Sequence, residues 1–280
     1  MKVNGVELCV ESFGVPTDPA ILLIHGAGHS LLAWEDDFVG RLVAGGRYVT
    51  RFDSRDAGLS TTFPVGEPGY GLADLVTDAA GVIAGLGLTG GAHVVGMSQG
   101  AAVSQLLALD HPDLVASLTL ASSTPGGPGH DQPDLPGMTE ELRAVFAADP
   151  GTGPDWTDEA AVIEYLVGAE RPFMAEFDED AVRRQSARIV GRSSDIAAQL
   201  TNPFLIDAGA PWRDRLGRIS APTLVLHGAE DPLFPLAHGR ALAAEIPGAR
   251  FLELARTGHE VFPRSQWDVV VPALLEHTAR

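Results

Sequence analysis

Two kinds of segment alternate along most of the chain. Short segments rich in apolar and β-branched residues predict strands, and longer segments with apolar residues at helical spacing predict helices. The predicted strands lie at residues 20–24, 47–52, 92–95, 115–120, 222–227 and 249–254, and the predicted helices at residues 35–45, 72–86, 101–110, 236–245 and 263–278. Such alternation predicts an α/β fold, with a mostly parallel sheet flanked by helices on both faces. Residues 1–13 are expected to form a hairpin around Asn4-Gly5.

The alternation stops between residues 122 and 214. This stretch begins with several Pro and Gly residues and continues with helical patterns that start near Thr139, Thr157 and Asp178. We therefore expect a core domain of residues 1–121 and 215–280 and a helical cap of residues 122–214 that lies over one end of the sheet. The apolar residues of this stretch include Phe146, Trp156, Phe173, Met174, Phe177, Phe204 and Trp212.

Composition narrows the range of functions. The chain has 280 residues, 45% of them hydrophobic, and a formal net charge of −18, which argues against binding to nucleic acid or to an anionic membrane surface. Cys9 is the only cysteine, so no internal disulfide or thiolate metal cluster is expected. Neither a leader pattern nor a long apolar run is present, which predicts a soluble, cytoplasmic protein. We expect neither a cofactor nor a metal, and the sequence predicts no particular oligomeric state.

The sequence Gly96-Met97-Ser98-Gln99-Gly100 lies between a predicted strand and a predicted helix. A G-x-S-x-G pattern in this context is typical of a nucleophile elbow, a sharp turn that exposes a serine hydroxyl above the sheet. Ser98 is therefore the predicted nucleophile. A serine in an ordinary glycine-rich turn is the alternative reading.

Two further reactive residues follow predicted strands. Asp231 comes after the strand at 222–227, and His259 comes after the strand at 249–254. Because the carboxyl ends of parallel strands share one edge of a sheet, we expect both to lie near Ser98. His259 is predicted to be the general base and Asp231 the carboxylate that orients it, in the order Ser, Asp, His. Glu230 competes with Asp231 for the carboxylate role.

Other residues have predicted roles around this centre. The backbone N–H groups of Ala27 and Gln99 are expected to form the oxyanion hole. Asp53, Arg55 and Asp56 are expected to form a structural network within their loop. The residues expected to contact substrate are His29, Trp34, Met97, Phe146 and Phe173.

These motifs together resemble the α/β-hydrolase superfamily along nearly the whole chain. Within it, the chain is similar to bacterial carboxylesterases of the aclacinomycin methylesterase type. The matching stretches are residues 51–61, 93–98, 108–111 and 231–259. The resemblance implies a helical cap over the pocket and hydrolysis of a methyl ester on a polycyclic aromatic polyketide. It also implies the roles given above for Ser98, Asp231, His259, Ala27 and Gln99, although Gln99 stands where the family has methionine.

The sequence thus predicts a serine carboxylic-ester hydrolase for a mid-sized or bulky apolar ester, a small molecule, acting through an acyl-enzyme. A hydrolase of carbon–carbon bonds, or a cofactor-free haloperoxidase or perhydrolase, would use the same three residues. A ligand-binding receptor built on the same fold is the non-enzymatic alternative.

Overall fold

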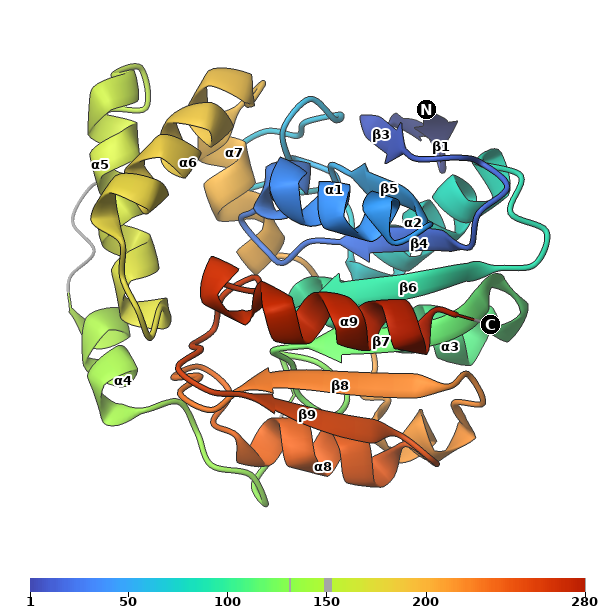
Figure 1. Cartoon of the computed structure of the whole chain (residues 1–280). Helices are drawn as coiled ribbons and strands as arrows, with labels where there is room; N and C mark the ends of the chain where they lie inside the picture. The colour runs from blue at the N-terminus through green and yellow to red at the C-terminus, as the bar shows by residue number, and fades with distance from the viewer. Residues whose placement is uncertain (131, 149–152, 280) are drawn as a thin grey trace.

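The computed structural model describes residues 1–130, 132–148 and 153–279. Its centre is a seven-stranded sheet in the order β3-β5-β4-β6-β7-β8-β9 (Figure 1). Neighbouring strands are parallel except for β3 and β5, which are antiparallel. The strands are β3 (Val10–Phe13), β4 (Ala20–Ile24), β5 (Tyr48–Phe52), β6 (Ala92–Met97), β7 (Val115–Ala121), β8 (Thr223–Gly228) and β9 (Arg250–Leu254). The predicted α/β fold with a mostly parallel sheet is confirmed.

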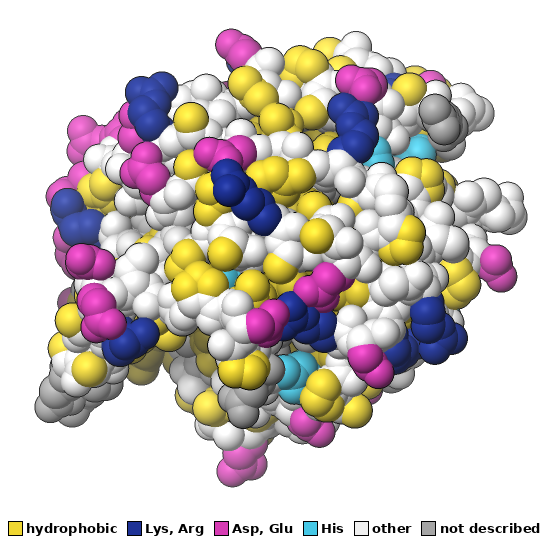
Figure 2. Space-filling view, turned by 90° about the horizontal axis from the view of Figure 1, so that it is seen from below, with side chains coloured by type: hydrophobic (Ala, Val, Ile, Leu, Met, Phe, Trp, Pro, Cys, Tyr) yellow, Lys and Arg dark blue, Asp and Glu magenta, His cyan; other side chains and the backbone are white. Residues whose placement is uncertain are grey.

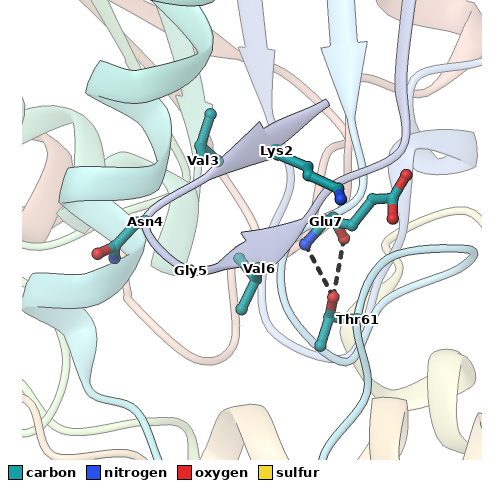
Figure 3. Close-up of a pocket in the computed structure, with 7 residues that line it drawn as sticks. All are labelled: Lys2, Val3, Asn4, Gly5, Val6, Glu7 and Thr61. Carbon is teal, nitrogen blue, oxygen red and sulfur yellow. Dashed lines mark hydrogen bonds between the residues drawn. The ribbon is translucent and has the colours of Figure 1, made fainter.

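The predicted hairpin at the N-terminus is shorter than expected. It consists of β1 (Lys2–Val3) and β2 (Val6–Glu7), which pair antiparallel. Asn4 and Gly5 have φ of +44° and +78°, as a tight hairpin turn requires. The expectation fails for residues 10–13, which leave the hairpin and form the edge strand β3 of the main sheet. Figure 3 shows the hairpin beside Thr61, whose hydroxyl accepts a hydrogen bond from the backbone N–H of Glu7.

Helices cover both faces of the sheet. α1 and α9 lie on one face, and α2, α3 and α8 lie on the other (Figure 1). The helices are α1 (Asp36–Ala44), α2 (Leu72–Gly85), α3 (Gln99–Asp110), α4 (Glu140–Ala147), α5 (Glu159–Glu170), α6 (Glu179–Arg192), α7 (Ile196–Thr201), α8 (Ala237–Glu245) and α9 (Trp267–His277). Short 3₁₀ helices are η1 (Leu31–Ala33), η2 (Pro112–Leu114), η3 (Arg171–Phe173), η4 (Asn202–Phe204), η5 (Arg213–Arg218) and η6 (Arg264–Gln266).

The central strands are buried on both faces because helices cover both. In β4, Leu22 and Ile24 belong to the apolar cluster under α2 and α3, whereas Ile21 and Leu23 belong to the cluster under α1 and α9. This alternation explains the continuous apolar run of β4, since each face of the strand needs its own apolar side chains.

Helices α4 to α7 lie together at the edge of the sheet where the parallel strands end (Figure 1). Val162, Leu166 and Val190 of α5 and α6 form a small apolar cluster of their own. Trp212, although inside the predicted cap, packs in the main core and donates a hydrogen bond from Nε1 to Oε1 of Gln105 (3.1 Å). The division into a core of residues 1–121 and 215–280 and a cap of residues 122–214 stays a prediction.

Buried polar groups join α6 and η4 to the loop after β5. Asp53 accepts hydrogen bonds from Leu31 N–H (2.9 Å), Leu59 N–H (3.0 Å) and Arg192 Nη1 (2.6 Å). Asp56 accepts a hydrogen bond from Asn202 Nδ2 (3.0 Å), so both acids bind the segment from α6 to η4.

The third member of the predicted loop network bonds elsewhere. Arg55 pairs with Asp78 of α2, with 2.7 Å between Nε and Oδ2. Asp53, Arg55 and Asp56 therefore fix the loop, as the sequence predicted, but through Arg192, Asp78 and Asn202 outside the loop rather than by a network within it. Within the described residues, no helix is long and apolar enough to cross a membrane.

Candidate active site

Ser98 occupies a strained turn between β6 and α3. Its φ and ψ are +53° and −116°, a conformation that a residue with a side chain rarely adopts. A Cβ at Gly96 would lie 2.3 Å from the carbonyl oxygen of Gly100, and a Cβ at Gly100 would lie 2.3 Å from that of Ile24. The two glycines of the pattern are therefore required by the close approach of neighbouring backbone.

Ser98, His259 and Asp231 form one hydrogen-bonded chain. His259 Nε2 lies 3.0 Å from Ser98 Oγ, and His259 Nδ1 lies 2.9 Å from Asp231 Oδ2. The three residues come from the loops after β6, β9 and β8, as the parallel topology predicted. Glu230, the competing acid, is exposed to solvent, whereas the Asp231 side chain is fully buried.

Asp231 is held as an anion by its partners. Burial alone would raise the pKa of its carboxyl, but the nearby His259 and the hydrogen bond to that ring outweigh burial and keep the pKa below its usual range. Backbone N–H groups of Leu233 and Phe234 donate to Oδ1 at 2.9 and 2.8 Å. The ionised carboxylate therefore stays an acceptor for the Nδ1–H of His259, and Nε2 is the ring nitrogen that faces Ser98 Oγ.

Two other histidines near these loops have structural partners. His25 Nδ1–H donates to the Gly26 carbonyl (2.8 Å), and its Nε2 accepts from Ser54 N–H (3.1 Å). Burial lowers the pKa of His25 to about 4, so the ring is neutral at pH 7 and joins the loop after β4 to the loop after β5. His227 lies 3.6 Å from Asp231 Oδ2 but bonds the Phe234 carbonyl at 2.7 Å. Burial lowers the pKa of His227 as well.

The two predicted oxyanion donors lie beside Ser98, with Gln99 at the first position of α3 and Ala27 in the loop after β4. Neither Ala27 N–H nor Gln99 N–H donates to an acceptor within the described chain. A Cβ at Gly26 would lie 3.3 Å from Ser98 Cβ, so the loop that carries Ala27 passes close to the serine. The Gln99 side chain points elsewhere, because its Nε2 donates to the Pro203 carbonyl (2.9 Å).

The segment around Phe173, in the predicted cap, packs against the loop that carries His259. The Phe173 carbonyl accepts a hydrogen bond from His259 N–H (2.7 Å), and the Phe173 ring centroid lies 6.1 Å from that of His259. Glu260 Oε1 accepts hydrogen bonds from Gly258 N–H (3.1 Å) and Ala175 N–H (3.4 Å). Its Oε2 is buried without a partner, and burial raises the pKa of this carboxyl. These contacts fix the loop that carries His259 to the segment around Phe173.

Two of the expected substrate contacts lie in the core instead. Trp34 is 0% exposed and packs against Phe38 and Phe262, with ring centroids 6.3 and 6.0 Å away. Met97 is 1% exposed and belongs to the same cluster, because alternate residues of β6 face the α1 and α9 side of the sheet. Both side chains pack inside the protein and do not line a surface site.

The remaining expected contacts differ in their distance from the hydrogen-bonded chain. Phe173 adjoins His259, as described above. Phe146 of α4 is 57% exposed and lies one ring further out, 6.2 Å from Phe173. His29 is half-buried in the turn that follows Ala27, where its N–H bonds the Gly26 carbonyl.

Sequence reasoning missed two aromatic residues near this centre. The Phe234 ring lies 5.4 Å from the His259 ring, edge to face. Phe234 comes three residues after Asp231, and its N–H donates to the Asp231 carboxylate. This short spacing could have identified Phe234 from the sequence. Phe204 of η4 lies over Gly28, and no local pattern marked it as a site residue.

Surface features elsewhere do not coincide with this centre. The hollow drawn in Figure 3 is lined by the hairpin residues 2–7 and Thr61, none of which was predicted as a site residue. On the face shown in Figure 2, basic side chains lie beside acidic ones rather than gathering in one area. Arg213 pairs with both Asp134 and Glu245. In residues 1–130, 132–148 and 153–279, no cluster of three His, Cys, Asp or Glu is placed to hold a metal ion.

The sequence matches the alpha/beta hydrolase fold family over residues 19–264. The chain belongs to this α/β-hydrolase family. It is 32% identical over 296 residues to rhodomycin D methylesterase DauP of Streptomyces sp. strain C5, covering 98% of this chain and 96% of that protein. The resemblance to carboxylesterases of the aclacinomycin methylesterase type is thus confirmed.

Other relatives in this family are named for different hydrolase activities. This α/β-hydrolase is 29% identical over 261 residues to 2-hydroxy-6-oxo-6-phenylhexa-2,4-dienoate hydrolase of Burkholderia cepacia, covering 89% of this chain and 82% of that protein. Among solved structures, a hydrolase from Pseudomonas aeruginosa aligns with a TM-score of 0.71 and 26% identity, covering 99% of this chain and 96% of that chain.

Proposed function

We propose that this α/β-hydrolase is a serine carboxylesterase that cleaves the methyl ester of a bulky, apolar acid. The observation that carries the proposal is the continuous hydrogen-bonded chain from Ser98 through His259 to Asp231. A serine hydroxyl is a poor nucleophile at neutral pH unless a base lies within hydrogen-bond reach. The 3.0 Å between Ser98 Oγ and His259 Nε2 meets that condition.

The first half of the reaction forms an acyl-enzyme. Ser98 Oγ attacks the ester carbonyl carbon while His259 Nε2 takes the hydroxyl proton. The carbonyl electron pair moves onto oxygen, which faces the N–H groups of Ala27 and Gln99. Preorganised donors of this kind contribute about 3–4 kcal/mol each to lowering the barrier. The C–O bond to the alcohol then breaks, and the alcohol leaves with the proton from His259.

The second half releases the acid. A water molecule attacks the acyl carbon while His259 Nε2 takes one of its protons. The bond to Ser98 Oγ then breaks, and His259 returns the proton to that oxygen. Asp231 stays ionised throughout and stabilises the imidazolium in both halves. The sum of the two halves converts the ester and water to a carboxylic acid and an alcohol.

The surroundings of His259 support a small alcohol. The leaving oxygen has to approach His259 Nε2 to take its proton. The rings of Phe173 and Phe234 pack against this imidazole from the cap and from the loop after β8, so they border the alcohol side. The similarity to a rhodomycin D methylesterase supports the same choice.

Labelling with a fluorophosphonate followed by an ester series tests the proposal. The wild-type protein is expected to be labelled at Ser98, and the Ser98→Ala variant is expected to lose labelling and about 10⁶-fold in kcat. Methyl esters of bulky acids should be hydrolysed faster than the matching butyl esters. Turnover of a vinylogous β-diketone in place of every ester would favour a carbon–carbon hydrolase, as the relative from Burkholderia cepacia is named. A protein that is neither labelled nor active would fit a receptor.

A further inference from the structure

Phe204 is a large apolar side chain in an unusual position. Its side chain lies in η4 and is 66% exposed, although most phenylalanines of the described chain are at least half-buried. A Cβ at Gly28 would lie 3.3 Å from Cε2 and Cζ of Phe204. The ring therefore rests on a glycine with φ of +75° and presents its remaining surface to solvent.

The ring is held beside the proposed oxyanion donors by two glutamines. Gln99 Nε2 donates to the carbonyl of Pro203, the residue before Phe204 (2.9 Å). Gln199, which is fully buried in α7, donates from Nε2 to the Gly28 carbonyl (3.1 Å) and accepts from Gly58 N–H (3.0 Å). One end of the segment from Gln199 to Phe204 is thus bonded to the loops after β4 and β5, and the other end is bonded to the first residue of α3.

The order of strands places Phe204 opposite the base. The strand β6, which leads to Ser98, has β4 on one side and β7, β8 and β9 on the other. Asp231 and His259 follow β8 and β9, whereas Gly28 follows β4. The alcohol side of the proposed ester faces His259, and the oxyanion faces Ala27 and Gln99. Because the alcohol and the acyl group leave the carbonyl carbon in different directions, an alcohol beside His259 turns the acyl group toward the β4 side of Ser98, where Phe204 rests on Gly28.

Resting on the proposed esterase function, we propose that Phe204 is the residue that selects the acyl group, with a preference for a flat aromatic one. An aromatic acyl group covers the exposed face of the ring and gains about 0.5–1.5 kcal/mol beyond the area it buries, whereas a saturated ring of similar size gains the burial alone. The Gln99 side chain acts as a positioning group, since it seats the segment that carries Phe204.

A pair of substrates isolates the aromatic contribution. Methyl 2-naphthylacetate and methyl 2-decahydronaphthylacetate carry ring systems of similar size, and both have the carbonyl one methylene away from the ring, so their intrinsic reactivities are similar. The quantity to measure is the ratio of kcat/KM for the two esters. Phe204→Leu is expected to lower this ratio about three- to tenfold, mainly through a higher KM for the naphthyl ester. Phe204→Trp is expected to keep or raise it.

Two further variants complete the experiment. Gln99→Met keeps the backbone N–H but loses the bond to Pro203, and it is expected to lower the ratio in the same direction as Phe204→Leu. Leu205→Ala is the matched control, because Leu205 is a neighbouring, 56% exposed apolar residue and its ratio should equal that of the wild type. Circular dichroism checks that each variant is folded.

The outcomes separate the two proposals. A ratio unchanged by Phe204→Leu, in a protein still labelled at Ser98, would overturn the role of Phe204 and leave the esterase proposal standing. An equal fall of the ratio in Leu205→Ala would also overturn it. A wild-type protein that hydrolyses neither ester and takes no label would overturn the esterase proposal together with this one.

Discussion

Arg192 of α6 pairs with Asp53 at the end of β5, with 2.6 Å between Nη1 and Oδ2. The Asp53 side chain is fully buried, and its other bonds come from the backbone of Leu31 and Leu59. The pair joins the helices at the carboxyl ends of the strands to the loops that surround Ser98. Breaking it leaves a buried carboxylate short of one charged partner.

Arg192→Met is therefore expected to lower the free energy of unfolding by about 3 kcal/mol. Without Arg192, the Asp53 carboxylate stays buried and its desolvation is no longer offset by an opposite charge. Urea unfolding at pH 7 measures the loss. Arg183→Met is the matched control from the same helix, where Arg183 pairs with Glu164 and Glu179 at the surface. It should cost less than about 1 kcal/mol. Equal losses in the two variants would contradict the structural role of Asp53.

Asp231→Asn is expected to reduce kcat about 10⁴-fold while KM changes little. The amide keeps the size of the side chain, but it no longer holds His259 in the tautomer that leaves Nε2 free to accept a proton. Steady-state kinetics with a methyl ester measures the change. Glu230→Gln serves as the control, since the exposed Glu230 neighbours Asp231 without bonding His259. A loss of kcat in Glu230→Gln as large as that in Asp231→Asn would contradict the assignment of Asp231 as the acid that orients His259.

Gly96→Ala is expected to prevent folding or to cost more than about 4 kcal/mol, because its Cβ would lie 2.3 Å from both the Gly100 carbonyl oxygen and Ser104 Oγ. Gly168→Ala is the control, since a Cβ there meets nothing within 4 Å in the helix α5. This variant should gain about 0.5–1 kcal/mol from helix propensity. Thermal unfolding distinguishes the two. A stable, fully active Gly96→Ala protein would show that the elbow is looser than described.

The neutral His25 predicts a loss of stability in mild acid. Its pKa is lowered to about 4 in the folded protein, against about 6.5 in the unfolded chain. Because the unfolded chain takes up the proton first, this contribution is complete above pH 6.5 and is lost as the pH falls toward 4. Between pH 7 and pH 5 it amounts to about 2 kcal/mol.

His25→Gln retains a donor and an acceptor but does not titrate in this range. Urea unfolding at pH 7, 6 and 5 is expected to show a smaller loss for this variant than for the wild type, with the difference near 2 kcal/mol. Parallel curves for the two proteins would mean that His25 does not cause the acid sensitivity.

The sequence predicted six of the seven strands of the main sheet, the helices on its two faces and the three residues of the hydrogen-bonded chain, because each depends on local patterns. The apolar run before Gly96 and the helical pattern after Gly100 place Ser98 at a sharp turn. Parallel strands then bring the loops of Asp231 and His259 to the same edge, whatever lies between them in the chain. Asp231 was preferred to Glu230 because the acid of such a triad is usually the shorter carboxylate.

Only the tertiary structure decided which side chains surround this centre. Trp34 and Met97 are near the site in sequence, yet packing against α1 and α9 draws both into the core. Phe204 lies more than a hundred residues from Ser98, and it reaches Gly28 because Gln99 and Gln199 bond its segment across the fold. Strand and elbow patterns are set by neighbours along the chain. Contacts between the cap and the loops depend on packing at long range, which no short stretch of sequence encodes.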